Sequence, residues 1–290
     1  MIGMRPSAFW VHVCVAAAAV VALSGCAGSS VVDPVAQAAA VSELAPGFKA
    51  SLSEELIPPG SSGPVTGSGT EIFDQRDQRG ILSLRVDAEG HISTAETQYS
   101  DLALYMRLPG SRGSSITHGK PWVKIDLRGV GAALGINFSA LASAGASSPS
   151  QMLSYLKAAS GQVTRVGAEV VQGVQTTHYR ATIDYERYAG SVPPGQRTAA
   201  RASIAALERL TGLRDQSVDV WVDGQHRVRR EELTFHECVA GALEPTQIHL
   251  KLELYDFAVQ AIPAPPPGNE VADITSSVAG KLKQIQLGCQ

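Results

Sequence analysis

Short runs in which apolar and polar residues alternate recur along most of this 290-residue chain. The cleanest lies at 248–255, where Ile248, Leu250, Leu252 and Leu254 alternate with His, Lys, Glu and Tyr. Successive side chains of a β-strand point to opposite faces, so this period predicts a strand with one apolar face. Comparable runs, separated by turn residues, lie at 48–53, 70–73, 81–86, 96–99, 102–108, 121–127, 163–171, 174–185, 218–223 and 228–237.

These runs predict about 10–11 antiparallel strands, because closely spaced turn residues favour hairpins and meanders. A sheet of this size curls or closes. Periodicity also predicts two or three helices, at 33–45 with Asp33 as N-cap, at 151–159 and at 193–210. The stretch 129–148 is rich in Gly, Ala and Ser, and we interpret it as a flexible connection. Helices that cover one face of such a sheet give an α+β fold.

The N-terminus has the layout of an export signal. Arg5 is the only charged residue before Asp33, the stretch 8–23 is almost wholly apolar, and small residues precede Cys26. No charge follows immediately, as it would after a membrane-spanning helix. Leu23-Ser24-Gly25-Cys26 resembles the lipobox of bacterial lipoproteins, in which the cysteine thiol receives a diacylglycerol and becomes the new N-terminus. The alternative is an ordinary cleaved signal followed by an incidental cysteine.

This pattern divides the chain into three parts: a signal peptide at 1–25, a lipidated tether at 26–32 and a single domain at 33–290. Two acyl chains on Cys26 give stable anchoring, which predicts a lipid-anchored protein on the extracytoplasmic face of the cell membrane. The net charge is −3 and no basic stretch is present. The sequence therefore predicts no nucleic-acid partner.

Motifs of catalytic chemistry are missing from the sequence, which contains no GxSxG, HExxH, Walker or GxGxxG pattern. His236-Glu237-Cys238 is the one local cluster that suggests a metal site, but neighbours on a strand point to opposite faces and cannot converge on one ion. Asp219 and Asp223 share a strand face, where alternating acidic residues usually mark a solvated surface rather than a glycosidase pair. We therefore predict no catalytic residue, no metal site and no cofactor.

Several motifs, taken in order, resemble the actinobacterial lipoproteins of the LppX/LprAFG type, which in turn resemble the LolA lipoprotein carriers. The resemblance runs from about Asp33 to Ser277 and follows the lipobox. It implies a half-barrel, an open curved antiparallel sheet with helices across its concave face. Several relatives hold acyl chains or glycolipids between the sheet and the helices. The motifs are an Asp-Pro-rich helix, Gly-Lys-Pro-Trp-Val-Lys-Ile-Asp at 119–126, the Pro149 helix, Val166-Gly167 to Gly173-Val174, Thr176-Thr177-His178-Tyr179-Arg180 and Val220-Trp221-Val222-Asp223.

The resemblance implies a protein that binds or transfers lipid or glycolipid in a hydrophobic cavity, and we expect it to be a monomer. Each acyl CH₂ group buried there contributes about 0.8 kcal/mol. Periodicity does not determine which strand face is concave, and it fits a fully packed core as well as a cavity. A non-catalytic sensor or interaction lipoprotein that binds a protein or cell-envelope partner is the second hypothesis. The apolar residues expected to bind the ligand are Leu153, Leu156, Ile204, Leu207, Val218, Val220, Val222, Leu250, Leu252 and Leu254.

The four cysteines lead to a testable prediction. Cys14 lies in the signal peptide and Cys26 would carry the lipid, which leaves Cys238 and Cys289 in an oxidising compartment. We predict a disulfide between them, which would close a loop of about fifty residues and stabilise the fold by ~4 kcal/mol. Two buried free thiols are the alternative. Peptide mass mapping without reductant should find the Cys238 and Cys289 peptides linked, whereas two freely alkylated thiols would contradict the bridge.

Overall fold

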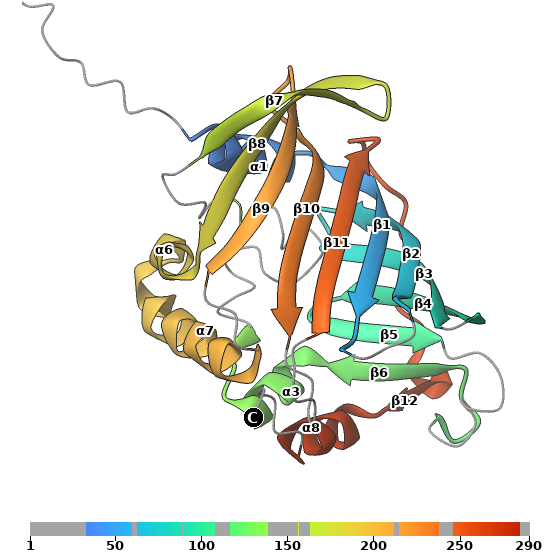
Figure 1. Ribbon diagram of the computed structural model, residues 1–290. Helices are drawn as coiled ribbons and strands as arrows, with labels where there is room; N and C mark the ends of the chain where they lie inside the picture. Colours follow the sequence, from blue (N-terminus) through green and yellow to red (C-terminus); the bar gives the residue numbers. More distant parts are fainter. Residues whose placement is uncertain are drawn as a thin grey trace, which may run out of the picture. The chain divides into compact units, whose positions relative to one another are not determined.

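The strands form one continuous sheet, in which most neighbours in sequence are also neighbours in space (Figure 1). The computed structural model describes residues 33–59, 63–88, 90–107, 117–138, 156, 163–211, 215–237 and 246–284. Within them, twelve strands follow the order β12-β6-β5-β4-β3-β2-β1-β11-β10-β9-β8-β7. All neighbouring pairs are antiparallel except β12 with β6, and the edge strands β7 and β12 do not pair with each other. The sheet is therefore open.

The strands are β1 Gly47–Ile57, β2 Val65–Asp74, β3 Arg79–Ala88, β4 His91–Ser100, β5 Ala103–Arg107, β6 Trp122–Asp126, β7 Thr164–Val171, β8 Val174–Asp184, β9 Asp215–Asp223, β10 Val228–Glu237, β11 Thr246–Tyr255 and β12 Val271–Asp273. The α-helices are α1 Pro34–Glu43, α3 Leu127–Leu134, α6 Tyr185–Ser191, α7 Arg197–Thr211 and α8 Thr275–Gln284. Two 3₁₀ turns, η1 Pro194–Gln196 and η2 Gly268–Glu270, complete the elements of the described residues.

The α+β class built on a large, mostly antiparallel sheet is confirmed. Every predicted run coincides with a strand, but the runs at 70–73 and 96–99 were predicted too short. Strand β2 begins at Val65 and β4 at His91, where Gly, Ser and Thr interrupt the apolar alternation. Backbone pairing with β1 and β3 continues through these polar residues, so tertiary context extends the strands beyond their hydrophobic pattern.

Two features differ from the sequence-based prediction, and a third is not tested. The stretch 129–148 begins inside helix α3 rather than in a connection: Asp126 accepts a hydrogen bond from the backbone N of Arg128 at 2.9 Å, and Gly135 ends the helix at φ +74°. The tail forms α8, which packs against α3, and the short β12 lies parallel to β6. The predicted helix at 151–159 lies outside the described residues, apart from Leu156.

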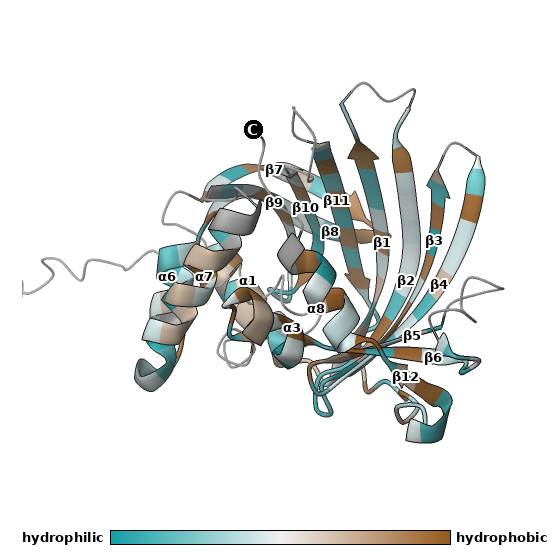
Figure 2. Cartoon of the chain, turned by 90° about the horizontal axis from the view of Figure 1, so that it is seen from below, coloured by the Kyte–Doolittle hydropathy of each residue, from teal (hydrophilic) through white to brown (hydrophobic). Residues whose placement is uncertain are grey.

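Helix α1 packs against β9 and β10, and we call the face of the sheet that it contacts the inner face. Ser42 holds the helix there, because its Oγ accepts a hydrogen bond from the backbone N of Val228 at 2.8 Å. Asp33 caps the first turn by accepting hydrogen bonds from the backbone N of Val35 and Ala36, as predicted. In Figure 2 the strands β7 to β4 form a curved wall with α1 on its inner side.

The opposite, outer face carries a polar and aromatic network across β7 to β11. The Trp221 ring stacks on His178 with centroids 4.1 Å apart, and the Arg230 guanidinium lies 5.0 Å from the centroid of the same ring. Trp221 Nε1 donates a hydrogen bond to Glu169 at 2.7 Å. Arg230 forms ion pairs with Glu169 at 3.0 Å and with Glu253 at 2.8 Å. The network therefore joins five neighbouring strands by side chains as well as by backbone.

This network predicts that Arg230→Met lowers the free energy of unfolding by about 2 kcal/mol, because half-buried Glu253 loses its cationic partner. The Arg230 side chain is 17% exposed. Arg180→Met is the matched control, since that guanidinium is 62% exposed and pairs with Asp219; it should change stability by less than about 0.5 kcal/mol. Urea denaturation measures both, and equal effects of the two substitutions would contradict the prediction.

Candidate functional site

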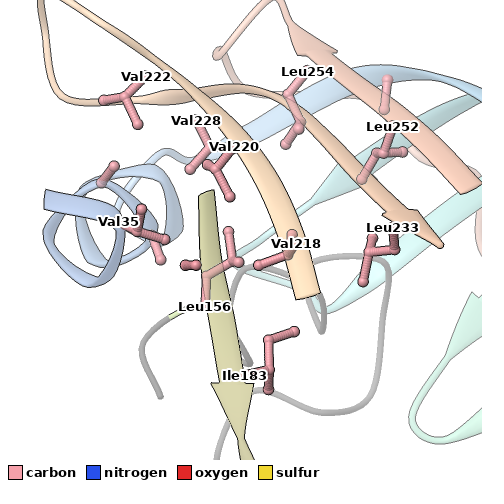
Figure 3. Packing of buried hydrophobic residues seen from close by; sticks show 14 of the residues in the cluster. Val35, Leu156, Ile183, Val218, Val220, Val222, Val228, Leu233, Leu252 and Leu254 are labelled. Carbon is pink, nitrogen blue, oxygen red and sulfur yellow. The ribbon is translucent and has the colours of Figure 1, made fainter. Parts of the chain in front are cut away.

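Most of the residues predicted to bind ligand lie together on the inner face. Leu156 and the β9 residues Val218, Val220 and Val222 belong to the same buried cluster as α1, together with Leu252 and Leu254 of β11; Leu250 packs against that cluster. Figure 3 shows the buried members of this cluster gathered between α1 and the strands. The periodicity left open which strand face is the inner one, and the packing of α1 resolves this for β9 and β11.

Three predicted ligand-binding residues are not brought into this cluster by the described structure. Ile204 lies in α7 and packs in a second cluster with Tyr188, Val192 and Ala200. Leu153 lies outside the described residues, as does the side chain of Leu207. Helix α7 therefore builds a separate core beside α6, whereas Leu156 packs in the cluster on the sheet.

The inner face extends beyond the part that α1 covers. The sheet register places Leu52 of β1 opposite Gly69 of β2, and Gly69 opposite Leu84 of β3. Leu82 lies opposite Thr97 of β4, which in turn lies opposite Met106 of β5. All of the bulky aliphatic side chains in these two rows are only partly buried. The inner face of β1 to β5 thus presents an apolar surface that the described residues cover incompletely.

Two glutamates interrupt this apolar face, and sequence reasoning missed both. Glu231 of β10 lies opposite Val220 and Leu252 and is 1% exposed, and neither carboxyl oxygen has a hydrogen-bond partner. Glu71 of β2 lies opposite Ala50 and Leu82 and is 3% exposed, and its Oε1 is buried without a partner. Glu231 is two residues from Leu233, and Glu71 is two residues from Phe73. This spacing was visible in the sequence and could have placed both glutamates on the apolar face.

Burial controls the ionisation of these two carboxyls. It raises the pKa of Glu231 to about 8 and that of Glu71 to about 8, from an ordinary value of 4.5. Burial, and secondarily the charge of Glu71, also raises the pKa of the Tyr99 hydroxyl. Gly80 leaves room for the Phe73 ring beside Glu71, because a Cβ at position 80 would lie only 2.9 Å from Phe73 Cδ2. The inner face therefore holds neutral carboxylic acids at neutral pH.

The outer face holds a different kind of surface. A groove of about 880 Å³ lies over β2 to β5, and its polar side chains include Ser83, Arg85, Glu96 and Arg107. By strand alternation these residues point away from Leu82, Leu84 and the rest of the inner face. Its lining also includes Gly69, Leu84 and Ala95, whose register positions belong to the inner face, so residues of both faces border the groove.

The acidic residues weighed as catalysts have structural partners. Asp219 accepts a hydrogen bond from Arg180 Nε at 3.1 Å and lies 2.7 Å from His178 Nε2. Asp223 is buried, and both its oxygens are bound by the turn that follows it and by Arg227 and Arg229. Within the described ranges, no three His, Cys, Asp or Glu residues are grouped to hold a metal ion. Cys238, Cys289 and Cys26 lie outside those ranges.

Comparison with curated proteins yields a relative of unknown role. It is an uncharacterized 31.2 kDa protein of Streptomyces griseus from the rplA-rplJ intergenic region, 28% identical over 169 residues. The match covers 57% of this chain and 52% of the relative, so the chain spans about half the length of the curated protein it matches. No family model matches the chain.

Similar solved structures include two mycobacterial lipoproteins. LprF from Mycobacterium bovis is 10% identical with a TM-score of 0.43, and covers 81% of this chain and 96% of its own. LppX from Mycobacterium tuberculosis is 12% identical with a TM-score of 0.44, and covers 80% and 100%. A LolA superfamily protein from Nitrosomonas europaea is 9% identical with a TM-score of 0.29, and covers 79% and 93%. These neighbours belong to the group that the sequence motifs resemble.

The buried glutamates predict an unusual dependence of stability on pH. In the unfolded chain both carboxyls ionise near pH 4.5, whereas in the fold they stay protonated until about pH 8. The folded state therefore binds more protons across this window. Its free energy of unfolding should fall as pH rises from 5 to 8, by on the order of 1 kcal/mol per pH unit for each group.

Urea denaturation at pH 5, 6, 7 and 8 measures this slope. The double substitution of Glu71→Gln with Glu231→Gln should flatten it, because an amide does not titrate. Glu232→Gln, at a half-exposed position of the outer face, should keep the slope of the unaltered protein. A double variant with an unchanged slope would show that other groups cause the dependence.

Proposed function

We propose that this chain is a membrane-anchored extracytoplasmic lipoprotein that binds or transfers lipid between the inner face of its sheet and its helices. Residues 1–25 would be removed, Cys26 would carry the anchor, 26–32 would form the tether, and 33–290 would act as one monomeric domain. In this proposal the curved sheet is a half-barrel and the helices lie across its concave face. The membrane and the lipid or glycolipid ligand are its partners.

One observation carries the proposal: the apolar inner face continues from the α1 cluster across β1 to β5, where Leu52, Leu82 and Leu84 remain partly exposed. Large contiguous apolar surfaces on soluble domains mark binding sites. An acyl chain laid along this surface would gain about 0.8 kcal/mol for each CH₂ group removed from water. No chemical step is required of such a protein.

The predicted ligand-binding residues take different parts in this proposal. Val218, Val220, Leu252 and Leu254 are fully packed against protein and would form the closed end of the site. Leu250 is partly buried and would lie where the packed region meets the open one. Leu153, Leu156, Ile204, Leu207 and Val222 complete the proposed set.

The proposal predicts that Leu84→Arg prevents uptake of a fluorescent acyl probe, because the substitution places a charge on the apolar surface. Leu84 does not belong to the packed cluster, so the fold should persist, as circular dichroism can confirm. Ser83→Arg is the matched control, since the neighbouring side chain points to the outer face; it should bind the probe like the unaltered protein. The chain carrying Cys26→Ala and purified without its signal serves for all measurements.

Native mass spectrometry of the same material should detect co-purifying lipid. Repeated absence of lipid, together with no uptake of the fluorescent probe by the protein without inner-face substitutions, would contradict the proposal. This result would favour a sensor or interaction module. Equal loss of binding in Leu84→Arg and Ser83→Arg would show that the probe does not occupy the inner face.

A further inference from the structure

Glu231 and Glu71 occupy positions where an aliphatic side chain would satisfy the packing. Glu231 is surrounded by members of the buried cluster, with Val220 and Leu252 opposite it and Leu233 two residues further along its own strand. Glu71 lies on the same face beside Phe73, with Ala50 opposite. Neither side chain forms an ion pair with a described residue. Both glutamates therefore lower the stability of the fold relative to leucine or methionine.

The missing partners are the significant feature. Buried polar groups in native proteins are almost always hydrogen-bonded, and a lone unpaired one costs about 1–3 kcal/mol. Here Glu231 leaves two carboxyl oxygens unpaired and Glu71 leaves one. Both belong to the face on which the proposed ligand lies. A ligand that supplied the missing hydrogen bonds would recover this cost on binding.

The surroundings define the chemistry of such a ligand. A carboxyl in an apolar pocket with no cation nearby is protonated, so its O–H donates one hydrogen bond and its carbonyl oxygen accepts another. The charge of Glu71 contributes to the raised pKa of the neighbouring Tyr99 hydroxyl. The pKa of Glu231 is raised by burial alone. A cationic or metal ligand does not fit two protonated acids. Ester and hydroxyl oxygens fit them, because they pair with a neutral acid without bringing a charge into the apolar site.

The spacing of the two residues adds a further condition. Strands β10 and β2 are separated by β11 and β1, so the glutamates lie three strand spacings apart, about 14 Å across the strands, and are offset by two residues along them. One small polar head group does not span that distance. Each glutamate would therefore bind a different oxygen function of an extended molecule.

We propose that Glu231 and Glu71 are the polar binding residues of the inner face, and that each donates a hydrogen bond as a carboxylic acid to an ester or hydroxyl oxygen of an uncharged lipid. This inference rests on the proposed function, because it assumes that the inner face binds lipid. It adds that the site selects uncharged, oxygen-bearing lipids over plain hydrocarbons.

The test compares two ligands on the mature chain Cys26–Gln290 carrying Cys26→Ala, after removal of bound lipid. Displacement of the neutral fluorophore N-phenyl-1-naphthylamine reports the binding of dioleoylglycerol and of squalane, a hydrocarbon without oxygen. The variants are Glu231→Leu, Glu71→Leu and the corresponding glutamines. Glu232→Leu, half-exposed on the outer face, is the matched control.

Glu231→Leu and Glu71→Leu should each weaken dioleoylglycerol binding about tenfold, which corresponds to about 1.4 kcal/mol, and leave squalane binding unchanged. Both should raise the melting temperature, since they remove an unpaired buried group. The glutamine variants keep a donor and an acceptor, so they should bind dioleoylglycerol within about threefold of the unaltered protein. Glu232→Leu should change neither affinity.

Each other outcome has a definite meaning. If neither dioleoylglycerol nor squalane displaces the fluorophore from the unaltered protein, the proposed function fails. If it binds both ligands and the leucine variants bind dioleoylglycerol equally well, the polar role of the glutamates is overturned while lipid binding stands. Loss of binding in the glutamine variants as well would overturn the neutral hydrogen bond and point to an ionised carboxylate. If one leucine variant does not fold, the other provides an independent test.

Discussion

The width of the sheet is the constraint on which the rest of the structure depends. Twelve strands spaced about 4.8 Å apart span more than 50 Å if laid flat, whereas one helix with its side chains is about 10–12 Å wide. Among the described helices, α1 contacts β9 and β10, and α3 and α8 contact β6. The strands between them depend on curvature to shield their apolar inner side chains. A surface that curvature shields incompletely is available to a ligand.

The two faces of the sheet differ in how their polar groups are paired. On the outer face, Trp221 and Arg230 belong to a network in which carboxylates and cations are paired across five strands. On the inner face, Glu231 and Glu71 are buried without partners. A fold whose outer face is stabilised by paired charges can tolerate unpaired neutral carboxyl groups on its inner face, because the free energy of unfolding is a property of the whole sheet. The cost is thus confined to the face where a ligand would remove it.

The sequence allowed prediction of the parts that depend on side-chain alternation. The run at 248–255 matches β11, and the same period placed Val218, Val220 and Val222 on one face of β9. It did not reveal β12, whose three residues are too few to show a period, nor α3, whose Gly- and Ala-rich sequence resembles a connection. Those elements are fixed by long-range partners, such as the backbone pairing of β12 with Trp122 and Val123. The inner face itself became identifiable only when α1 was placed on it.

The glutamates show why composition rules fail at such a site. A glutamate in an alternating strand is ordinarily assigned to the solvated face, yet Glu231 has the parity of Leu233 and Phe235 and must point with them. Strand alternation determines the face to which a side chain points, whereas the polarity of a residue only suggests that it is exposed to solvent. The two criteria disagree wherever a polar side chain is buried. Local rules that disagree with the global fold tend to mark functional positions. Here the two buried glutamates lie on the inner face, which the described helices leave partly uncovered. Their unfavourable burial is therefore linked to the face on which a ligand would bind.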